Sequence, residues 1–355
     1  MLLIYPGGMP AALERLAKAT AQGLDVVGAS SEVGDPAGMH YAQWAFLPRY
    51  DAPDFKAALQ DLRARFGIDA IYCPHAMVWR YLKQIAPDSM LGMTLENGEP
   101  YAEDLASYRA LFGRAAAMQR QPASLASPTA PGPALSDAER HGLLRLASLV
   151  PGMCSEQKIS ALADVARHCP PGDLVELGSW WGKSAVVLGW LSRRYGIGKL
   201  LCVDPWTHEG QLHDRTDLDD LSLSFDMEET VEVFRTNLAM LAGDANYLRL
   251  AAYDAAAVYA SRKTVTSQAF GKTDYEGRIA LLHIDGNHQL ENVREDVRLW
   301  TPMVMPGGWV VMDDYLWPFG DGPRQVGDEL LDAWGDEVAT AFVSGTALFV
   351  QRRPD

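Results

Sequence analysis

An apolar strand, a glycine turn and an apolar helix follow one another without a break in the second half of the chain. The strand is expected at Leu174–Leu177, the turn at Gly178–Ser184 and the helix at Ala185–Leu191. Glycines in such a turn let the backbone approach a ligand, and the helix N-terminus offers unpaired amides and a positive dipole end. Strands and helices alternate from Asp173 to the C-terminus, which predicts a doubly wound α/β sheet.

A stretch rich in Pro, Ala and Ser at 119–137 interrupts the apolar periodicity. We expect it to link a smaller α/β auxiliary domain at 1–118 to the doubly wound, Rossmann-like domain at 138–355. A chain of 355 residues agrees with two domains, because roughly 150 residues per domain is usual. In the first domain we expect three short strands and two helices: Leu2–Tyr5, Asp25–Gly28 and Asp69–Cys73, a helix around Leu13 and Leu16, and a helix at Ala58–Phe66.

The first domain also carries a resemblance in its loops. Its opening IYPGG, its VVGASSE segment and its strand order resemble the pre-ATP-grasp domain that precedes ATP-grasp enzymes. No ATP-grasp domain follows in this sequence, so no nucleotide chemistry is assigned to this half. A role in shaping a substrate site or in oligomerisation is expected instead.

Composition excludes several classes of partner. The formal charge of −15 repels phosphate backbones and anionic lipid, which argues against nucleic acid and membrane surfaces. No apolar stretch approaches the roughly 20 residues that a bilayer requires, and the N-terminus lacks a basic region before its apolar run. A cytoplasmic location is expected. Four scattered cysteines without a CxxC pair predict neither disulfides nor a zinc site: Cys73, Cys154, Cys169 and Cys202.

Acidic residues flank the glycine turn. Trp180 stands where the dinucleotide fingerprint requires glycine, which disfavours NAD. Glu176 lies two residues before Gly178, and Asp204 ends the next expected strand, 22 residues after Gly182. A carboxylate at the end of that strand can accept both hydroxyls of a ribose.

This turn, followed by a strand that ends in an acid, resembles the first motifs of class I S-adenosylmethionine-dependent methyltransferases. The resemblance implies S-adenosylmethionine as cofactor, with Asp254 contacting the adenine after a third strand at Asn246–Leu250. A helix N-cap explains Asp254 equally well. The residues expected to bind the cofactor are Glu176, Gly178, Ser179, Trp180, Gly182, Ser184, Asp204, Asp254 and Asp285.

Two further strands are expected at Ile279–Ile284 and Trp309–Met312, with a helix over Leu290–Trp300 between them. Open α/β sheets bind ligands at the carboxyl ends of their strands. Four polar residues follow these two strand ends: Asp285, His288, Asp313 and Asp314.

Carboxylates without cysteine suit a hard cation, so Mg²⁺ or Mn²⁺ is expected on Asp285, Asp313 and Asp314. Such an ion would bind a substrate hydroxyl oxygen and neutralise the developing alkoxide. His288 is expected to remove the hydroxyl proton, since a neutral imidazole is a competent base near pH 7. Structural roles, such as capping a turn, are the alternative for each residue taken alone.

The segments IDGNH and PGGWVVMDDY resemble the O-methyltransferase branch that includes macrocin O-methyltransferase and the mycinamicin sugar methyltransferases, along with the cephalosporin hydroxylase-like group. The resemblance covers roughly residues 156–353, and 28 residues separate Asp285 from Asp313 as in that branch. It implies the same three metal ligands and the same base, His288. The N-terminal half departs from those enzymes, which leaves the acceptor open.

A polar insertion at 205–236 carries His208 and His213 and is expected to be a lid, or else a solvated helical excursion. Trp206 is expected either to flank the same opening or to belong to the core. The candidates for substrate contact are His208, Tyr315 and Trp317.

The sequence therefore predicts an S-adenosylmethionine- and Mg²⁺-dependent O-methyltransferase. Its acceptor would be a hydroxyl of a sugar or another specialised small molecule, and a homo-oligomer is expected. Two alternatives stay open. One is an NAD-type Rossmann oxidoreductase, which Trp180 disfavours, and the other is a non-catalytic binding module, which the retained His288 and the three acids disfavour.

Overall fold

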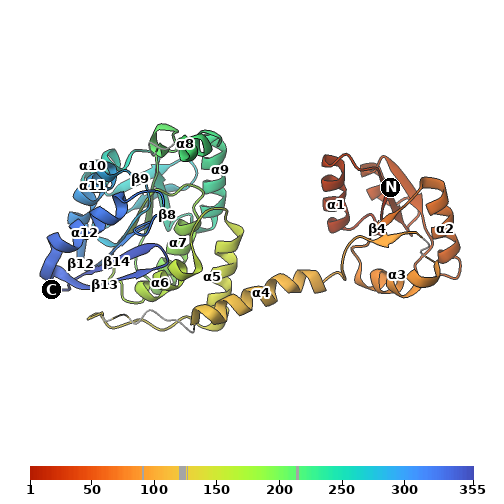
Figure 1. Cartoon of the computed structure of the whole chain (residues 1–355), viewed down its shortest axis with the longest axis horizontal. Coiled ribbons are helices and arrows are strands. Elements are labelled where there is room, and N and C mark those ends of the chain that lie inside the picture. Colours follow the sequence, from red (N-terminus) through yellow and green to blue (C-terminus); the bar gives the residue numbers. More distant parts are fainter. Residues whose placement is uncertain (90–91, 120–124, 126, 213–215) are drawn as a thin grey trace. The chain divides into compact units, whose positions relative to one another are not determined.

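The computed structural model divides into two compact units, Met1–Ala110 and Leu111–Asp355. It describes residues 1–89, 92–119, 125, 127–212 and 216–355 (Figure 1). Among the helices of these described ranges, none combines the length and the apolar character needed to cross a membrane.

The first unit is built on a parallel five-stranded sheet in the order β3-β2-β1-β4-β5. One face packs against α2 and α3 through residues such as Phe55 and Leu82, and α1 covers the other face. This is the small α/β layer that the sequence predicts. The elements are β1 (Leu2–Ile4), α1 (Pro10–Ala21), β2 (Val26–Ser30), η1 (Pro36–His40), β3 (Gln43–Phe46), α2 (Phe55–Phe66), β4 (Ala70–Tyr72), α3 (Ala76–Ser89) and β5 (Thr94–Leu95).

The second unit contains a seven-stranded sheet in the order β13-β14-β12-β11-β6-β7-β8. All neighbours pair in parallel except β14, which is antiparallel to both β12 and β13. The predicted doubly wound α/β fold is confirmed. The strands are β6 (Asp173–Leu177), β7 (Leu200–Val203), β8 (Ala245–Leu248), β11 (Ile279–Ile284), β12 (Val304–Met312), β13 (Val338–Ser344) and β14 (Ala347–Arg352), with a separate hairpin of β9 (Thr264–Ser267) and β10 (Gly271–Asp274).

Helices cover both faces of this sheet (Figure 1). Successive residues of β6 alternate between the faces, so that Leu174 packs with α5, α6, α7 and α9, whereas Val175 packs with α10, α11 and α12. The helices are α5 (Asp137–Leu149), α6 (Glu156–Ala166), α7 (Lys183–Tyr195), α8 (Thr216–Leu223), α9 (Met227–Leu238), α10 (Ala252–Arg262), α11 (Leu290–Trp300) and α12 (Gly322–Trp334), with short 3₁₀ turns at η2 (Glu209–Gln211), η3 (Ala239–Leu241), η4 (Thr301–Met303) and η5 (Gly335–Glu337).

Helix α4 (Ala102–Gln119) runs across the boundary between the units, and its residues Leu111 and Ala115 pack into the core of the second unit. Residues 120–124 and 126 of the predicted linker lie outside the described residues. Helix α5 begins after Ser136, whose side chain forms a capping box with Glu139. The domain bounds drawn from the sequence stay a prediction.

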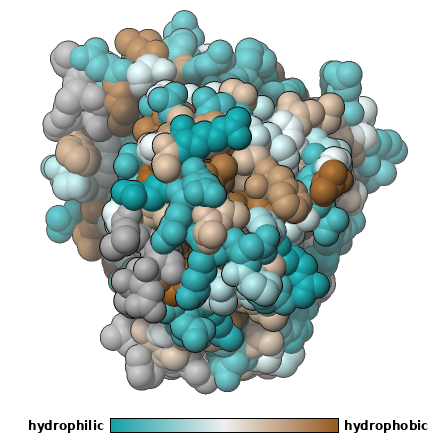
Figure 2. Space-filling model, turned by 90° about the vertical axis from the view of Figure 1, so that its right-hand side faces the viewer, coloured by the Kyte–Doolittle hydropathy of each residue, from teal (hydrophilic) through white to brown (hydrophobic). Residues whose placement is uncertain are grey.

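Hydrophilic residues cover much of the face shown in Figure 2, with hydrophobic residues between them. Single exposed apolar side chains, such as Val33 and Met39 in the first unit, are usual on protein surfaces. The predicted homo-oligomer stays a prediction.

Candidate active site

Four parallel strands end side by side at one edge of the second sheet. The backbone ladder continues one residue past these ends, because the amides of Asp285 and Asp313 donate to the carbonyls of Leu177 and Ile284 at 2.8 Å each. The backbone of Asp285 and Asp313, the first residues after β11 and β12, is therefore fixed by the same kind of hydrogen bond as the strands. This is the edge at which open α/β sheets bind ligands.

The glycine turn after β6 has a left-handed backbone at both of its glycines. Gly178 and Gly182 have φ of +81° and +86°, and Trp180 between them also has a positive φ of +42°. A Cβ atom on Gly178 would lie 2.1 Å from the carbonyl oxygen of Asp285, so only glycine fits there. The turn expected to hold the cofactor therefore contacts the loop that follows β11.

Asp204 shapes this turn through its carboxylate. It accepts hydrogen bonds from the amides of Ser179 and Trp180 at 2.9 Å and from the amide of Trp206 at 2.7 Å. Burial raises the pKa of Asp204 above its ordinary value, although the three amides act in the opposite direction. The predicted ribose contact of Asp204 stays a prediction, and the structure adds this turn-forming role.

Glu176 lies fully buried beneath the same turn. One of its oxygens accepts a hydrogen bond from the Ser179 hydroxyl at 2.7 Å, and the other lies 3.2 Å from Nδ1 of His283 on β11. Glu176 thus connects the turn to the neighbouring strand. Its predicted contact with the cofactor stays a prediction.

Aromatic rings line the outer side of the turn. Trp180 and Trp181 stack with ring centroids 4.6 Å apart, and Phe225 meets both rings edge-on. Trp206 is fully buried and packs on Phe234, so of its two predicted roles the core position is the one observed.

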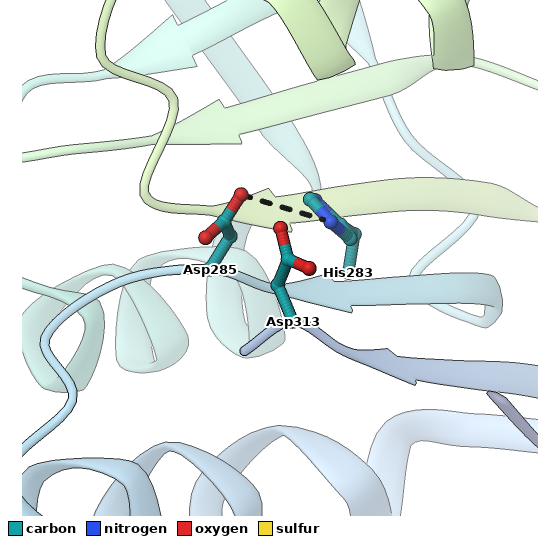
Figure 3. A group of neighbouring side chains, drawn as sticks. All are labelled: His283, Asp285 and Asp313. Atoms are coloured by element: carbon teal, nitrogen blue, oxygen red, sulfur yellow. Dashed lines mark ion pairs between the residues drawn. The ribbon is translucent and has the colours of Figure 1, made fainter. Parts of the chain in front are cut away.

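A buried group that we call the inner group consists of His283, Asp285 and Asp313 (Figure 3). The alternation of residues along β11 and β12 brings all three to the face of the sheet that α6 covers. The Nε2 atom of His283 lies 3.9 Å from Oδ2 of Asp285. From α6, the ammonium of Lys158 reaches this group, pairing with Asp313 and lying 3.4 Å from Oδ2 of Asp285.

Burial and charge act in opposite directions on this group. Burial alone would lower the pKa of Lys158, but Asp285 and Asp313 outweigh it and hold that pKa above its ordinary value. Burial alone would raise the pKa of Asp313, but the Lys158 ammonium outweighs it and holds that pKa below its ordinary value. Burial, together with Asp313, raises the pKa of Asp285. Lys158 is therefore a charged ammonium and not a general base.

The surroundings of His283 favour its neutral form. Burial and the charge of Lys158 lower the pKa of His283, although Glu176 acts in the opposite direction. A neutral imidazole is the form that can serve as a metal ligand or accept a hydrogen bond.

A second, more exposed group, which we call the outer group, consists of Asp285, His288 and Asp314. The Nε2 atom of His288 lies 3.2 Å from Oδ2 of Asp314, and the imidazole packs on the Trp317 ring at 4.6 Å between centroids. Asp314 has a positive φ of +50°, a conformation found at turns. The imidazole therefore lies next to a carboxylate and an aromatic ring.

The predicted metal ligands are divided between these two groups. Asp285 belongs to both, whereas Asp313 belongs to the inner group and Asp314 to the outer group; in the described part of the chain, no group contains all three acids. The ammonium of Lys158 contacts both carboxylates of the inner group. The two carboxylates of the outer group fit Mg²⁺ or Mn²⁺ in their donor chemistry.

The insertion at 205–236 contains η2, α8 and all of α9 except its last two residues. The side-chain amide of Asn287, in the loop after β11, donates to the carbonyl of Leu212 at 2.7 Å. His208 is half-buried, and His213 lies outside the described residues. The insertion therefore contacts the loop that carries His288, and its role as a lid stays a prediction.

The remaining predicted residues lie at various depths. The Tyr315 hydroxyl donates to Asp328 on α12 at 2.7 Å, whereas Trp317 contacts His288 directly. Asp254 is exposed in the first turn of α10, and Ser184 is buried in the first turn of α7. Their roles stay predictions.

Sequence reasoning missed Lys158 and His283. Lys158 stands on the apolar stripe of its helix with Leu162 and Val165, which is an unusual place for an unpaired charge. His283 likewise interrupts the apolar run of β11. A charged or polar residue at a position expected in the apolar core is the sequence signal that could have identified both residues.

A search of curated proteins found no match to this sequence. A family model described as a methyltransferase domain matches residues 175–315. Among solved structures, the O-methyltransferase NovP is 17% identical over 70% of this chain and 98% of its own, with a TM-score of 0.38. The methyltransferase MycE from the mycinamycin biosynthetic pathway, solved in complex with Mg and SAH, is 16% identical over 60% of this chain and 55% of its own, with a TM-score of 0.37. A putative caffeoyl-CoA O-methyltransferase from Staphylococcus aureus is 12% identical over 60% of this chain and 90% of its own, with a TM-score of 0.39.

The glycine turn and both side-chain groups fall within the matched residues. Residues 175–315 are therefore a methyltransferase domain, and the predicted resemblance to class I methyltransferases is confirmed for this part of the chain. Lys158 precedes the matched residues.

Proposed function

We propose that this methyltransferase transfers the methyl group of S-adenosylmethionine to a hydroxyl of a sugar or another specialised small molecule. One observation carries the proposal. The glycine turn expected to hold the cofactor contacts the loop after β11, at Gly178 and Asp285, and that loop also bears His288. A sulfonium methyl bound at the turn would therefore lie near an imidazole and two carboxylates.

His288 is the proposed general base. It takes the proton of the acceptor hydroxyl while the oxygen forms a bond to the methyl carbon. The carbon–sulfur bond breaks, its electron pair returns to sulfur, and the products are a methyl ether and S-adenosylhomocysteine. Asp314, 3.2 Å from the imidazole, orients His288 and stabilises the positive charge that the imidazole gains.

We also propose that Mg²⁺ or Mn²⁺ binds the outer group through Asp285 and Asp314. Such an ion would neutralise the alkoxide that develops on the acceptor. Magnesium prefers oxygen ligands, which leaves the His288 imidazole available as the base. Asp313, the third predicted ligand, pairs with Lys158.

The aromatic side chains near the turn favour a cyclic acceptor. Trp180, Trp181 and Phe225 form one cluster, and Trp317 packs on His288. Such faces pack well on sugar rings and on aromatic rings.

The test is an acceptor panel of glycosides, nucleotide sugars and catechols, incubated with the protein and S-adenosylmethionine. Release of S-adenosylhomocysteine and the mass of the methylated product are measured, once with EDTA and once with Mg²⁺. We expect turnover on a hydroxyl acceptor that Mg²⁺ increases. Methylation of amino or thiol acceptors alone would contradict the proposal.

On the acceptor that the panel identifies, we expect His288→Ala to lower kcat by about 10²- to 10⁴-fold, the usual contribution of a general base. The affinity for S-adenosylhomocysteine should not change, because the imidazole acts on the acceptor. His40→Ala, an exposed histidine of the first unit, is the control. An unchanged kcat in His288→Ala would rule this residue out as the base.

A further inference from the structure

Lys158 occupies a place that is unfavourable for a lysine unless something holds it there. It lies in the first turn of α6, where Ser155 caps its backbone amide at 3.1 Å. The helix dipole is positive at this end, and the side chain is only 2% exposed. Its charge is compensated by Asp313 and Asp285, which are 155 and 127 residues away in the sequence.

The inner group has more binding capacity than Lys158 uses. The Oδ1 atom of Asp313 and the Nε2 atom of His283 are both buried, and neither has a hydrogen-bond partner in the described part of the chain. His283 is held from its other nitrogen by Glu176. Two carboxylates and an oriented imidazole around one point are the donors of a divalent metal site.

We propose that the Lys158 ammonium is the resident cation of the inner group, in the position that a second divalent ion would otherwise take. The inference deepens the proposed function and rests on it for the outer group, because it confines the catalytic Mg²⁺ or Mn²⁺ to the carboxylates beside His288. Lys158 is a positioning residue, since it contacts Asp285 and Asp313 and not the reacting atoms.

The formal charges of the two groups agree with this assignment. Asp285, Asp313 and Asp314 carry three negative charges when ionised. The ammonium supplies one positive charge, and a single divalent ion in the outer group supplies the other two. A second divalent ion in the inner group would exceed this balance while Lys158 is present.

The test replaces Lys158 with methionine, which has a similar length and no charge. Bound Mn²⁺ is counted at equilibrium for the wild-type chain and for Lys158→Met. We expect about one additional Mn²⁺ per chain in Lys158→Met, because the vacated donor set contains an imidazole and two carboxylates. The matched control is Lys199→Met, whose lysine also pairs with an aspartate, Asp244, but at the surface.

Thermal unfolding gives a second readout that is independent of activity. In EDTA we expect Lys158→Met to melt about 10 °C below the wild-type chain, because two buried carboxylates lose their cation. Mn²⁺ should restore most of this loss. The double variant Lys158→Met/Asp313→Asn should neither bind the additional ion nor respond to Mn²⁺ beyond the wild-type response. If Lys158→Met folds only when Mn²⁺ is present, that requirement also supports the proposal.

The proposal is overturned if Lys158→Met binds the same number of ions as the wild-type chain, or if Mn²⁺ stabilises both chains equally. It is also overturned if the wild-type chain itself binds an ion that Asp313→Asn removes and Asp314→Asn does not. Titration of S-adenosylhomocysteine into the same wild-type sample tests the proposed function separately, since cofactor binding does not depend on how many ions the acids hold.

Discussion

Buried acids in the second unit experience two different environments. Asp313 lies beside an ammonium, and its pKa is held below its ordinary value. Asp296 on α11 is only 8% exposed, and burial, reinforced by the charge of Glu295, raises its pKa to about 7. The first acid is ionised throughout the physiological range, whereas the second changes its charge within that range.

Asp296 should make the protein less stable as the pH rises. The folded chain binds the proton more tightly than the unfolded chain, whose aspartate has a pKa of about 3.9. The free energy of unfolding therefore falls between about pH 4 and pH 7. The free energy of unfolding of Asp296→Asn lacks this fall. Between pH 5 and pH 8 we therefore expect it to rise by roughly 2 to 3 kcal/mol relative to that of the wild-type chain.

Urea unfolding of both chains at the two pH values measures this gain. Asp332→Asn, at an exposed position on α12, is the control and should keep the wild-type pH dependence. Parallel stability curves for Asp296→Asn and the wild-type chain would show that Asp296 does not titrate in this window.

At the scale of elements, the site depends on how closely the β6–α7 turn fits against the end of β11. A side chain on Gly178 would collide with backbone at Asp285, and backbone cannot move aside as a side chain can. The same contact brings the cofactor turn and the acids together. We therefore expect both stability and cofactor binding to depend on Gly178.

We expect Gly178→Ala to destabilise the second unit by at least about 3 kcal/mol, because a left-handed conformation and a backbone clash act together. Gly196→Ala at the end of α7 is the matched control. Gly196 has a φ of +64° with open space around it, so its replacement should cost only about 1 kcal/mol. Equal losses in the two variants, measured by thermal unfolding, would mean that the contact with Asp285 is unimportant.

The spacing of apolar residues predicted the elements that form the site. Each of β6, α7, β11 and α11 has a local signal in the sequence, either apolar residues at strand or helix spacing or a neighbouring glycine. It could not predict the pairing of Lys158 with Asp313, since the partners are 155 residues apart and meet only when α6 covers the sheet. Nor could it divide the acids between two groups. Asp313 and Asp314 are neighbours in sequence, but strand alternation and the positive φ of Asp314 direct them to different groups.

At the scale of the whole molecule, the chain has two units with separate cores. The first unit has its own sheet and apolar clusters, whereas α4 from Leu111 onward packs with the second unit. The residues of both side-chain groups, together with Lys158, all belong to the second unit. We therefore expect the cofactor site to be complete without the first unit.

A chain of residues 111–355 should bind S-adenosylhomocysteine with the affinity of the full-length protein, within a factor of about 3, which corresponds to less than about 1 kcal/mol. Circular dichroism and a cooperative thermal transition would first establish that the shortened chain folds. A folded 111–355 chain with much weaker binding would assign part of the cofactor site to the first unit.

The central claim is that the Gly178–Gly182 turn binds S-adenosylmethionine beside the acids and His288. The most direct test is calorimetric titration of S-adenosylmethionine and S-adenosylhomocysteine into the full-length protein, in EDTA and then in Mg²⁺. We predict one molecule bound per chain with a micromolar dissociation constant in both conditions, because the turn and Asp204 do not depend on the cation. Absence of binding in both conditions, from protein shown to be folded, would contradict the account.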